Sequence, residues 1–179
     1  MSTEADWVGE VHKFWFGAPE RWFKPDPDFD AQIRSRFTDL YERLKQEEPG
    51  AMTARASVAA VLVLDQFPRH MFRGTAQEFA TDWEALSVAR SAVDGGADQR
   101  VPIDERMFLY MPFMHSEEPD TQRRSVALFA ALDVPELWRV ARDHKMVIDK
   151  FGRFPHRNKV LGRPSTPDEI AFLKTGLTA

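Results

Sequence analysis

Apolar residues recur at intervals of three and four along almost the whole chain, the spacing that places them on one face of an α-helix. The clearest case is a predicted helix over 26–48, whose apolar positions are Phe29, Ile33, Phe37, Leu40 and Leu44. Signals for strands are weak, because β-branched residues fall within helical periods and no Asn-Gly or Asp-Gly turn joins two alternating runs. We therefore predict an all-α protein of about seven to nine helices.

Start and stop signals set the limits of the predicted helices. The helix over 26–48 begins with Asp26 as its cap and Pro27 in its first turn. A nearly all-apolar helix over 53–66 is expected to be central and to stop before Pro68. The other predictions are an aromatic opening segment from Trp7 to Gly17, a helix that starts at a capping box of Thr75 and Glu78 and ends at Gly95, helices over 102–111, 120–132 and 135–151, a short helix opened by Pro155, and a last helix with a capping box of Thr166 and Glu169.

Composition limits the classes of function. The 179 residues fit one all-helical domain over 1–179. With 24 basic and 28 acidic residues the net charge is −4, so we expect no nucleic-acid partner. No apolar run is long enough to span a bilayer, and the polar, acidic start lacks the pattern of a signal peptide, so we expect a cytoplasmic protein without a membrane partner. Cysteine is absent, the five histidines lack ligand spacing, and nucleotide-binding and hydrolase motifs are missing, so we predict neither a metal nor a cofactor.

An acid and two arginines surround the end of the apolar helix over 53–66. Asp65 falls on the face expected to point inward, and Arg69 and Arg73 follow one and two turns later. Burying such groups is costly unless they are paired. Either a functional site or a buried ion pair between Asp65 and Arg69 explains the pattern.

Two other helices carry polar side chains among apolar ones. His144 interrupts the otherwise apolar stripe of the predicted helix over 135–151, where a hydrogen-bonded core histidine is the alternative to a proton-transfer role. Tyr110 and Arg106 lie one turn apart and are weaker candidates, since both residue types are common at the boundary of a core.

The segment over 151–163 is basic and contains no acid. Its basic residues are Arg153, Arg157, Lys159 and Arg163. If Pro155 opens a short helix, His156 and Asn158 lie in or next to its first turn, where free backbone N–H groups favour an anion. The alternatives are a solvated basic loop, or arginines that bind carboxylates of neighbouring helices.

Three blocks of sequence carry a resemblance: VLDQFPRHMFRGTAQEFATD at 63–82, FLYMPFMHSE at 108–117 and KFGRFPHRNKVLGRPSTPDEIAFL at 150–173. They resemble the signature blocks of a bacterial family known as domain of unknown function 924. The resemblance implies an all-α domain of tetratricopeptide-like antiparallel helix pairs and carries no established activity. His70 stands where the family commonly has a small polar residue. The matching residues are Asp65, Gln66, Arg69, Arg73, Asp82, Tyr110, His115, Ser116, Glu117, Arg153, His156, Arg157, Asn158 and Arg163.

Three hypotheses about function arise from these residues. The first is an Arg/His pocket for a small molecule with a phosphate or carboxylate group, with or without catalysis. The second is a helical interaction module that binds a peptide or protein partner. The third treats the same residues as internal ion pairs that hold helix ends together. For the first, the proton-transfer candidates are His156, His144, His115 and Asp65, and the ligand-binding candidates are Arg69, Arg73, Arg153, Arg157, Asn158, Tyr110 and Arg163.

Overall fold

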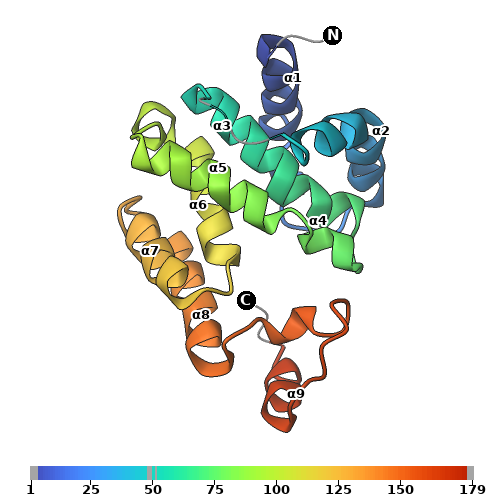
Figure 1. Cartoon of the computed structure of the whole chain (residues 1–179), viewed down its shortest axis with the longest axis vertical. Helices are drawn as coiled ribbons and strands as arrows, with labels where there is room; N and C mark the ends of the chain where they lie inside the picture. Colours follow the sequence, from blue (N-terminus) through green and yellow to red (C-terminus); the bar gives the residue numbers. More distant parts are fainter. Residues whose placement is uncertain (1–3, 48–49, 51, 177–179) are drawn as a thin grey trace. The chain divides into compact units, whose positions relative to one another are not determined.

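The protein is all-helical, as predicted (Figure 1). The computed structural model describes residues 4–47, 50 and 52–176, and no strand occurs in these ranges. The α-helices are α1 (Glu4–Phe16), α2 (Pro27–Leu44), α3 (Ala54–Val61), α4 (Phe67–Met71), α5 (Asp82–Asp94), α6 (Ile103–His115), α7 (Pro119–Ala130), α8 (Pro135–Phe151) and α9 (Pro167–Leu173). A π-helical segment, Leu62–Gln66, joins α3 to α4 without a break.

The described residues belong to two compact units. The N-terminal unit comprises residues 1–73 and 77–112, and the C-terminal unit comprises residues 74–76 and 113–179. The expectation of a single domain over 1–179 stays a prediction.

The continuous helix of α3, the π-helical segment and α4 is the central element of the N-terminal unit. It packs against α1, α2 and α5, and its residues from Ala56 to Pro68 are all buried. Aromatic rings fill the space around it, with Trp15, Phe37 and Phe67 at most 1% exposed. The predicted central position of this helix is confirmed.

Two predicted helix limits in this unit are wrong. The central helix continues through Pro68 to Met71. The π-helical turn shifts the backbone hydrogen bonds before the proline. Pro68 has no N–H for the carbonyl of Leu64, and this carbonyl accepts a hydrogen bond from the Thr81 hydroxyl at 2.6 Å. The segment after Thr75 forms only a 3-10 turn, Ala76–Phe79, and α5 begins at Asp82.

In the C-terminal unit, α7 and α8 pack against each other as a helix pair. The short connection between them includes Asp133, whose φ of 55° lies in the left-handed region that aspartate tolerates. Gly152 closes α8 with φ 68°, as predicted for a glycine cap. Val147, Ile148 and Phe154 form a small core beneath Phe151 and Phe172. The predicted turn at Pro155 is a 3-10 helix, Pro155–Arg157, and the capping box of Thr166 and Glu169 is present.

Candidate functional site

The π-helical segment presents a buried acid to an arginine one turn later. Asp65 is fully buried, and Gln66 Nε2 donates to its Oδ2 at 2.5 Å. Arg69 Nη1 lies 3.3 Å from Asp65 Oδ1 and donates to the Asp65 carbonyl at 2.5 Å. Arg69 also donates twice to Asp82, at 2.9 and 3.2 Å. Although burial opposes the charged form, the carboxylates of Asp65 and Asp82 raise the pKa of Arg69, which therefore stays charged.

The other candidates in the N-terminal unit also contact acids. Arg73 donates to Asp30 at 3.2 Å, and the same carboxylate lies 2.7 Å from His70 Nδ1. Tyr110 donates its hydroxyl proton to the buried Asp98 at 2.6 Å. Burial, reinforced by this hydrogen bond, raises the pKa of Tyr110.

Two bidentate ion pairs hold the basic segment of the C-terminal unit. Arg153 donates to both oxygens of the buried Glu169, at 2.6 and 2.8 Å. The Arg153 guanidinium lowers the pKa of Glu169 to about 2. Arg163 donates to both oxygens of Glu117, at 2.7 and 3.0 Å. Burial works against ionisation of Glu117, but the hydrogen bond from Arg163 lowers its pKa.

Asn158 links these two pairs. It is fully buried, its Nδ2 donates to Glu169 at 3.2 Å, and its Oδ1 accepts from Arg163 Nε at 3.0 Å. Its three side-chain contacts, including one with Ser165, use most of the capacity of the amide. These contacts hold the Asn158 side chain in place within the loop.

Three successive carbonyls at the end of α6 accept side-chain donors. The buried Gln122 donates Nε2 to the carbonyls of Met114 and Ser116, each at 2.7 Å. Arg157 Nη2 donates to the carbonyl of His115 at 3.0 Å. The backbone on both sides of the His115 ring is therefore fixed.

Aromatic contacts gather the remaining candidates around Phe154. We call His115, His144, Phe154, His156 and Arg157 the imidazole cluster. The Arg157 guanidinium lies over the Phe154 ring at 4.7 Å, and the rings of His144 and His156 are each 5.6 Å from that ring. His115 and His144 are 6.3 Å apart. The three imidazoles are half-buried, whereas Arg157 is only 6% exposed.

His144 is neutral at physiological pH. Burial, aided by the positive charges of His115, Arg157 and His156, lowers its pKa to about 3. Its Nδ1 lies 2.9 Å from the Val140 carbonyl, and because a carbonyl oxygen only accepts, the ring proton is on Nδ1. Nε2 of His144 is therefore a hydrogen-bond acceptor, and too weak a base for efficient proton abstraction near neutrality.

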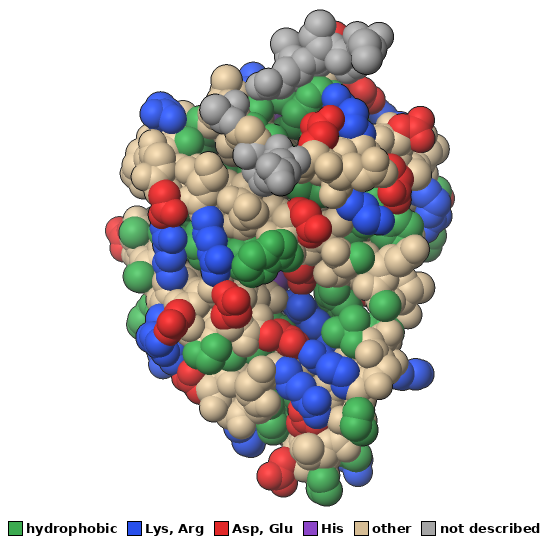
Figure 2. Space-filling model, viewed as in Figure 1, with side chains coloured by type: hydrophobic (Ala, Val, Ile, Leu, Met, Phe, Trp, Pro, Cys, Tyr) green, Lys and Arg blue, Asp and Glu red, His purple; other side chains and the backbone are tan. Residues whose placement is uncertain are grey.

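The structure thus divides the candidates into two groups. Arg69, Arg73, Arg153 and Arg163 each lie against a carboxylate. Figure 2 shows the same mixture of charges, with Lys and Arg side chains next to those of Asp and Glu. The contacts of these four arginines favour the third hypothesis, in which the arginines form internal ion pairs.

Sequence reasoning missed several residues that organise the candidates. Glu169 was predicted only as a helix cap, and Asp30, Asp98 and Gln122 were not singled out. Their partners are 11 to 43 residues away in most of these contacts, so no local pattern indicates them. The one available signal was the acid-free basic segment, which requires carboxylates from elsewhere.

Two general findings concern the described residues. None of their helices is both long enough and apolar enough to cross a bilayer. Within the same ranges, no three acidic or histidine side chains gather into a group that could hold a metal ion.

Comparisons with known proteins support the fold and the resemblance. A family model described as "Bacterial protein of unknown function (DUF924)" matches residues 11–176. The chain is similar to the solved structure described as "Structure of Protein of Unknown Function ATU0120 from Agrobacterium tumefaciens", with 36% sequence identity and a TM-score of 0.88. The similarity covers 97% of this chain and 99% of that chain. A comparison with curated protein sequences finds no match.

Proposed function

This chain belongs to the bacterial family DUF924, whose description gives no function, and from its own chemistry we propose that it is a cytoplasmic protein that binds a small anionic molecule at the imidazole cluster. The anionic group is a phosphate or a carboxylate. The observation that carries this proposal is that Arg157, His144 and His156 contact the ring of Phe154, His115 contacts His144, and two ion pairs fix the loop that holds Phe154, His156 and Arg157.

Each residue of the imidazole cluster has a role in this proposal. Arg157 supplies positive charge at a fixed position, because its guanidinium is held by the His115 carbonyl and by Phe154. His144 Nε2 accepts a hydrogen bond from a hydroxyl group of the ligand or from a protonated phosphate oxygen. His115 and His156 are half-buried and donate to the anion when protonated. Arg153, Asn158 and Arg163 position the loop.

Charge also favours an anion over a cation at this position. Besides burial, the guanidinium of Arg157 and the imidazoles of His115 and His156 oppose a positive charge on His144, whereas the Val140 carbonyl favours it. A bound anion reverses that effect, so binding and the His144 pKa are coupled.

The test follows the imidazole NMR signals of the uniformly labelled protein during titration with inorganic phosphate and, separately, with succinate. We expect His115, His144 and His156 to shift together, and the pKa of His144 to rise with saturation. The variant His156→Gln should weaken binding, whereas Lys24→Gln, which removes an exposed lysine of the N-terminal unit that is not a site candidate, should not. No shift at millimolar anion, or equal shifts at His12, contradicts the proposal.

The candidates Asp65, Arg69, Arg73 and Tyr110 belong to the N-terminal unit. Their part in the same ligand site remains a prediction. The Arg69→Gln and Tyr110→Phe variants in the same titration test it, because a ligand-binding role requires weaker binding in a variant that keeps its fold.

A second candidate function, a peptide- or protein-binding module of tetratricopeptide-like helix pairs, is favoured by one surface of α8. Trp138 and Met146 lie two turns apart on α8 and are 38% and 55% exposed. Native mass spectrometry of the protein purified from its own bacterium distinguishes the two functions. A bound metabolite supports the first, and a stoichiometric protein lost in the Trp138→Ser variant supports the second.

A further inference from the structure

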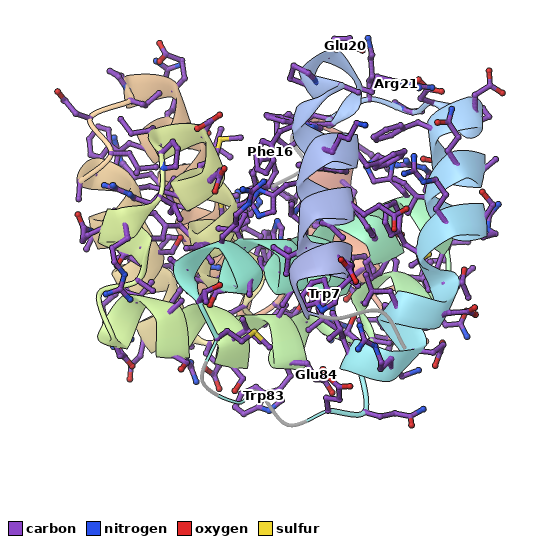
Figure 3. All side chains as sticks on the ribbon, turned by 90° about the horizontal axis from the view of Figure 1, so that it is seen from above. Trp7, Phe16, Glu20, Arg21, Trp83 and Glu84 are labelled. Atoms are coloured by element: carbon purple, nitrogen blue, oxygen red, sulfur yellow. The ribbon has the colours of Figure 1, made fainter. Side chains whose placement is uncertain are left out.

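A groove runs between α1 and α2 in the N-terminal unit. Gly9 and Lys13, one turn apart on α1, line it together with Gly17 directly after the helix, and α2 contributes Phe29 and Arg36. Its volume is about 630 Å³, within the range of small-molecule sites. In Figure 3 the side chains of the two helices extend towards one another, with Arg21 near one end of α1 and Trp7 near the other.

Aromatic rings and guanidinium groups are layered in the groove. The rings of Phe14 and Phe29 stack at 5.0 Å with an angle of 5°. Arg21 lies over Phe29 at 4.7 Å, and Arg36 lies over Phe14 at 4.8 Å and over Phe37 at 5.3 Å. The aromatic ring of a ligand can extend such a layer wherever a ring or guanidinium face is left uncovered.

The groove also carries a positive charge. Lys13, Arg21 and Arg36 line it together with one acid, Glu10. Arg21 donates to both oxygens of Asp26, at 2.7 and 2.8 Å, so the positive charge comes mainly from Lys13. Lys13 is exposed and forms no ion pair within the described part of the chain. Arg36 pairs with Glu10 at 3.0 Å, but both side chains are about half exposed, at 43% and 50%, so the pair is weak and readily displaced.

Gly9 keeps the groove open. A Cβ atom at Gly9 would meet no heavy atom within 4 Å, so packing does not require a glycine there. Glycine in the middle of a helix is less favourable than alanine or leucine, and no positive φ explains it at this position. The missing side chain leaves the space above Lys13 and Phe14 accessible.

We propose that the α1–α2 groove is a second binding site, for an aromatic anion whose ring stacks in the layer of Phe14 and Arg36 and whose charged group contacts Lys13. The open backbone at Gly9 admits the ring, and the anion replaces Glu10 as the partner of Arg36. This site lies in the N-terminal unit and is independent of the imidazole cluster.

The experiment measures binding of phenyl phosphate by isothermal titration calorimetry to the full chain. The variant Gly9→Leu adds a side chain whose Cβ meets no heavy atom within 4 Å, places its bulk at the groove and should weaken binding at least about tenfold. The variant Lys13→Gln removes an exposed charge and should weaken binding about fivefold. Lys24→Gln, an exposed lysine outside the groove, is the matched control and should leave the dissociation constant unchanged.

Two further measurements keep the result specific. Inorganic phosphate should bind at least about tenfold more weakly than phenyl phosphate, because it cannot stack. The Gly9→Leu variant should melt no lower than the unaltered chain, since leucine favours the helix. Equal affinity of Gly9→Leu and the unaltered chain overturns the proposal. The proposal is also overturned if His156→Gln loses phenyl phosphate binding while Gly9→Leu keeps it, because the ligand then occupies the imidazole cluster.

Discussion

At the scale of single residues, the arginines of this protein differ in what holds them. Arg153 and Arg163 each donate two hydrogen bonds to one carboxylate, whereas Arg157 donates to a carbonyl and stacks on a ring. The bidentate pairs restrain the loop from Gly152 to Thr166, and that loop carries Arg157 and His156. The function proposed for the imidazole cluster therefore depends on residues that do not themselves contact the ligand.

The Glu117–Arg163 pair should contribute measurably to stability. Arg163→Gln leaves a half-buried carboxylate without its strongest donor, and we expect a loss of about 1–3 kcal/mol in the free energy of unfolding. Glu117→Gln should cost a similar amount because the Phe154 N–H also loses its charged acceptor. Urea unfolding of both single variants and the double variant measures the coupling; strictly additive losses would show that the two side chains act separately.

The buried His144 should make stability depend on pH. The unfolded chain takes up a proton at this residue below its ordinary pKa of 6.5, and the folded protein does so only near pH 3. Stability is therefore fully present above pH 6.5 and is lost as the pH falls from 6.5 towards 3, by at most about 1.4 kcal/mol per pH unit. Urea midpoints of His144→Gln should fall less steeply over this range, and parallel profiles for the variant and the unaltered chain would contradict the assignment.

At the scale of the elements, the central helix shows how a proline is accommodated inside a helix. Pro68 has no N–H for the carbonyl of Leu64, and the hydroxyl of the buried Thr81 occupies that carbonyl instead. The π-helical segment adjoining it directs Asp65 and Gln66 into the interior. The residue that precedes α5 therefore supplies a hydrogen bond to the central helix.

Thr81→Val should destabilise the protein by about 1–3 kcal/mol, because it removes the buried hydrogen bond to the Leu64 carbonyl and the contact of the hydroxyl with Tyr41. In a Pro68→Ala background the alanine N–H can replace the hydroxyl, so the cost of Thr81→Val should be smaller there. Thermal unfolding of the four proteins gives the comparison. An equal cost in both backgrounds would mean that the hydroxyl of Thr81 serves another group.

At the scale of the whole molecule, a single domain over 1–179 predicts that the two units unfold together in one cooperative transition. If it holds, Arg163→Gln in the C-terminal unit should lower hydrogen-exchange protection in α3 as well as in α8. Exchange measured by mass spectrometry in mild urea separates the regions. Unchanged protection in α3 together with a loss in α8 would show that the two units unfold separately.

The sequence alone predicted the helices whose signals are local. Asp26, Gly152 and the capping box at Thr166 act within one turn of backbone, so neighbouring residues suffice to place them. The prediction of a long helix starting at Thr75 was wrong, because the same short pattern is compatible with a 3-10 turn. Whether an α-helix continues beyond that turn depends on how the following residues pack. The helix does not stop before Pro68, because the hydroxyl of Thr81 donates to the carbonyl of Leu64, 17 residues earlier in the chain, which Pro68 cannot bond. No pattern around Pro68 indicates that contact.

The partners of the charged residues were decided by the tertiary structure. Composition showed that the segment over 151–163 lacks acids, but Glu117 and Glu169 reach it from other elements. The pKa of His144 is likewise lowered by two effects of the fold. The first is burial, and the second is the proximity of His115, Arg157 and His156. Helix formation follows from short-range spacing, whereas the charge and proton affinity of a site depend on every group within a few ångströms, whatever its distance along the chain.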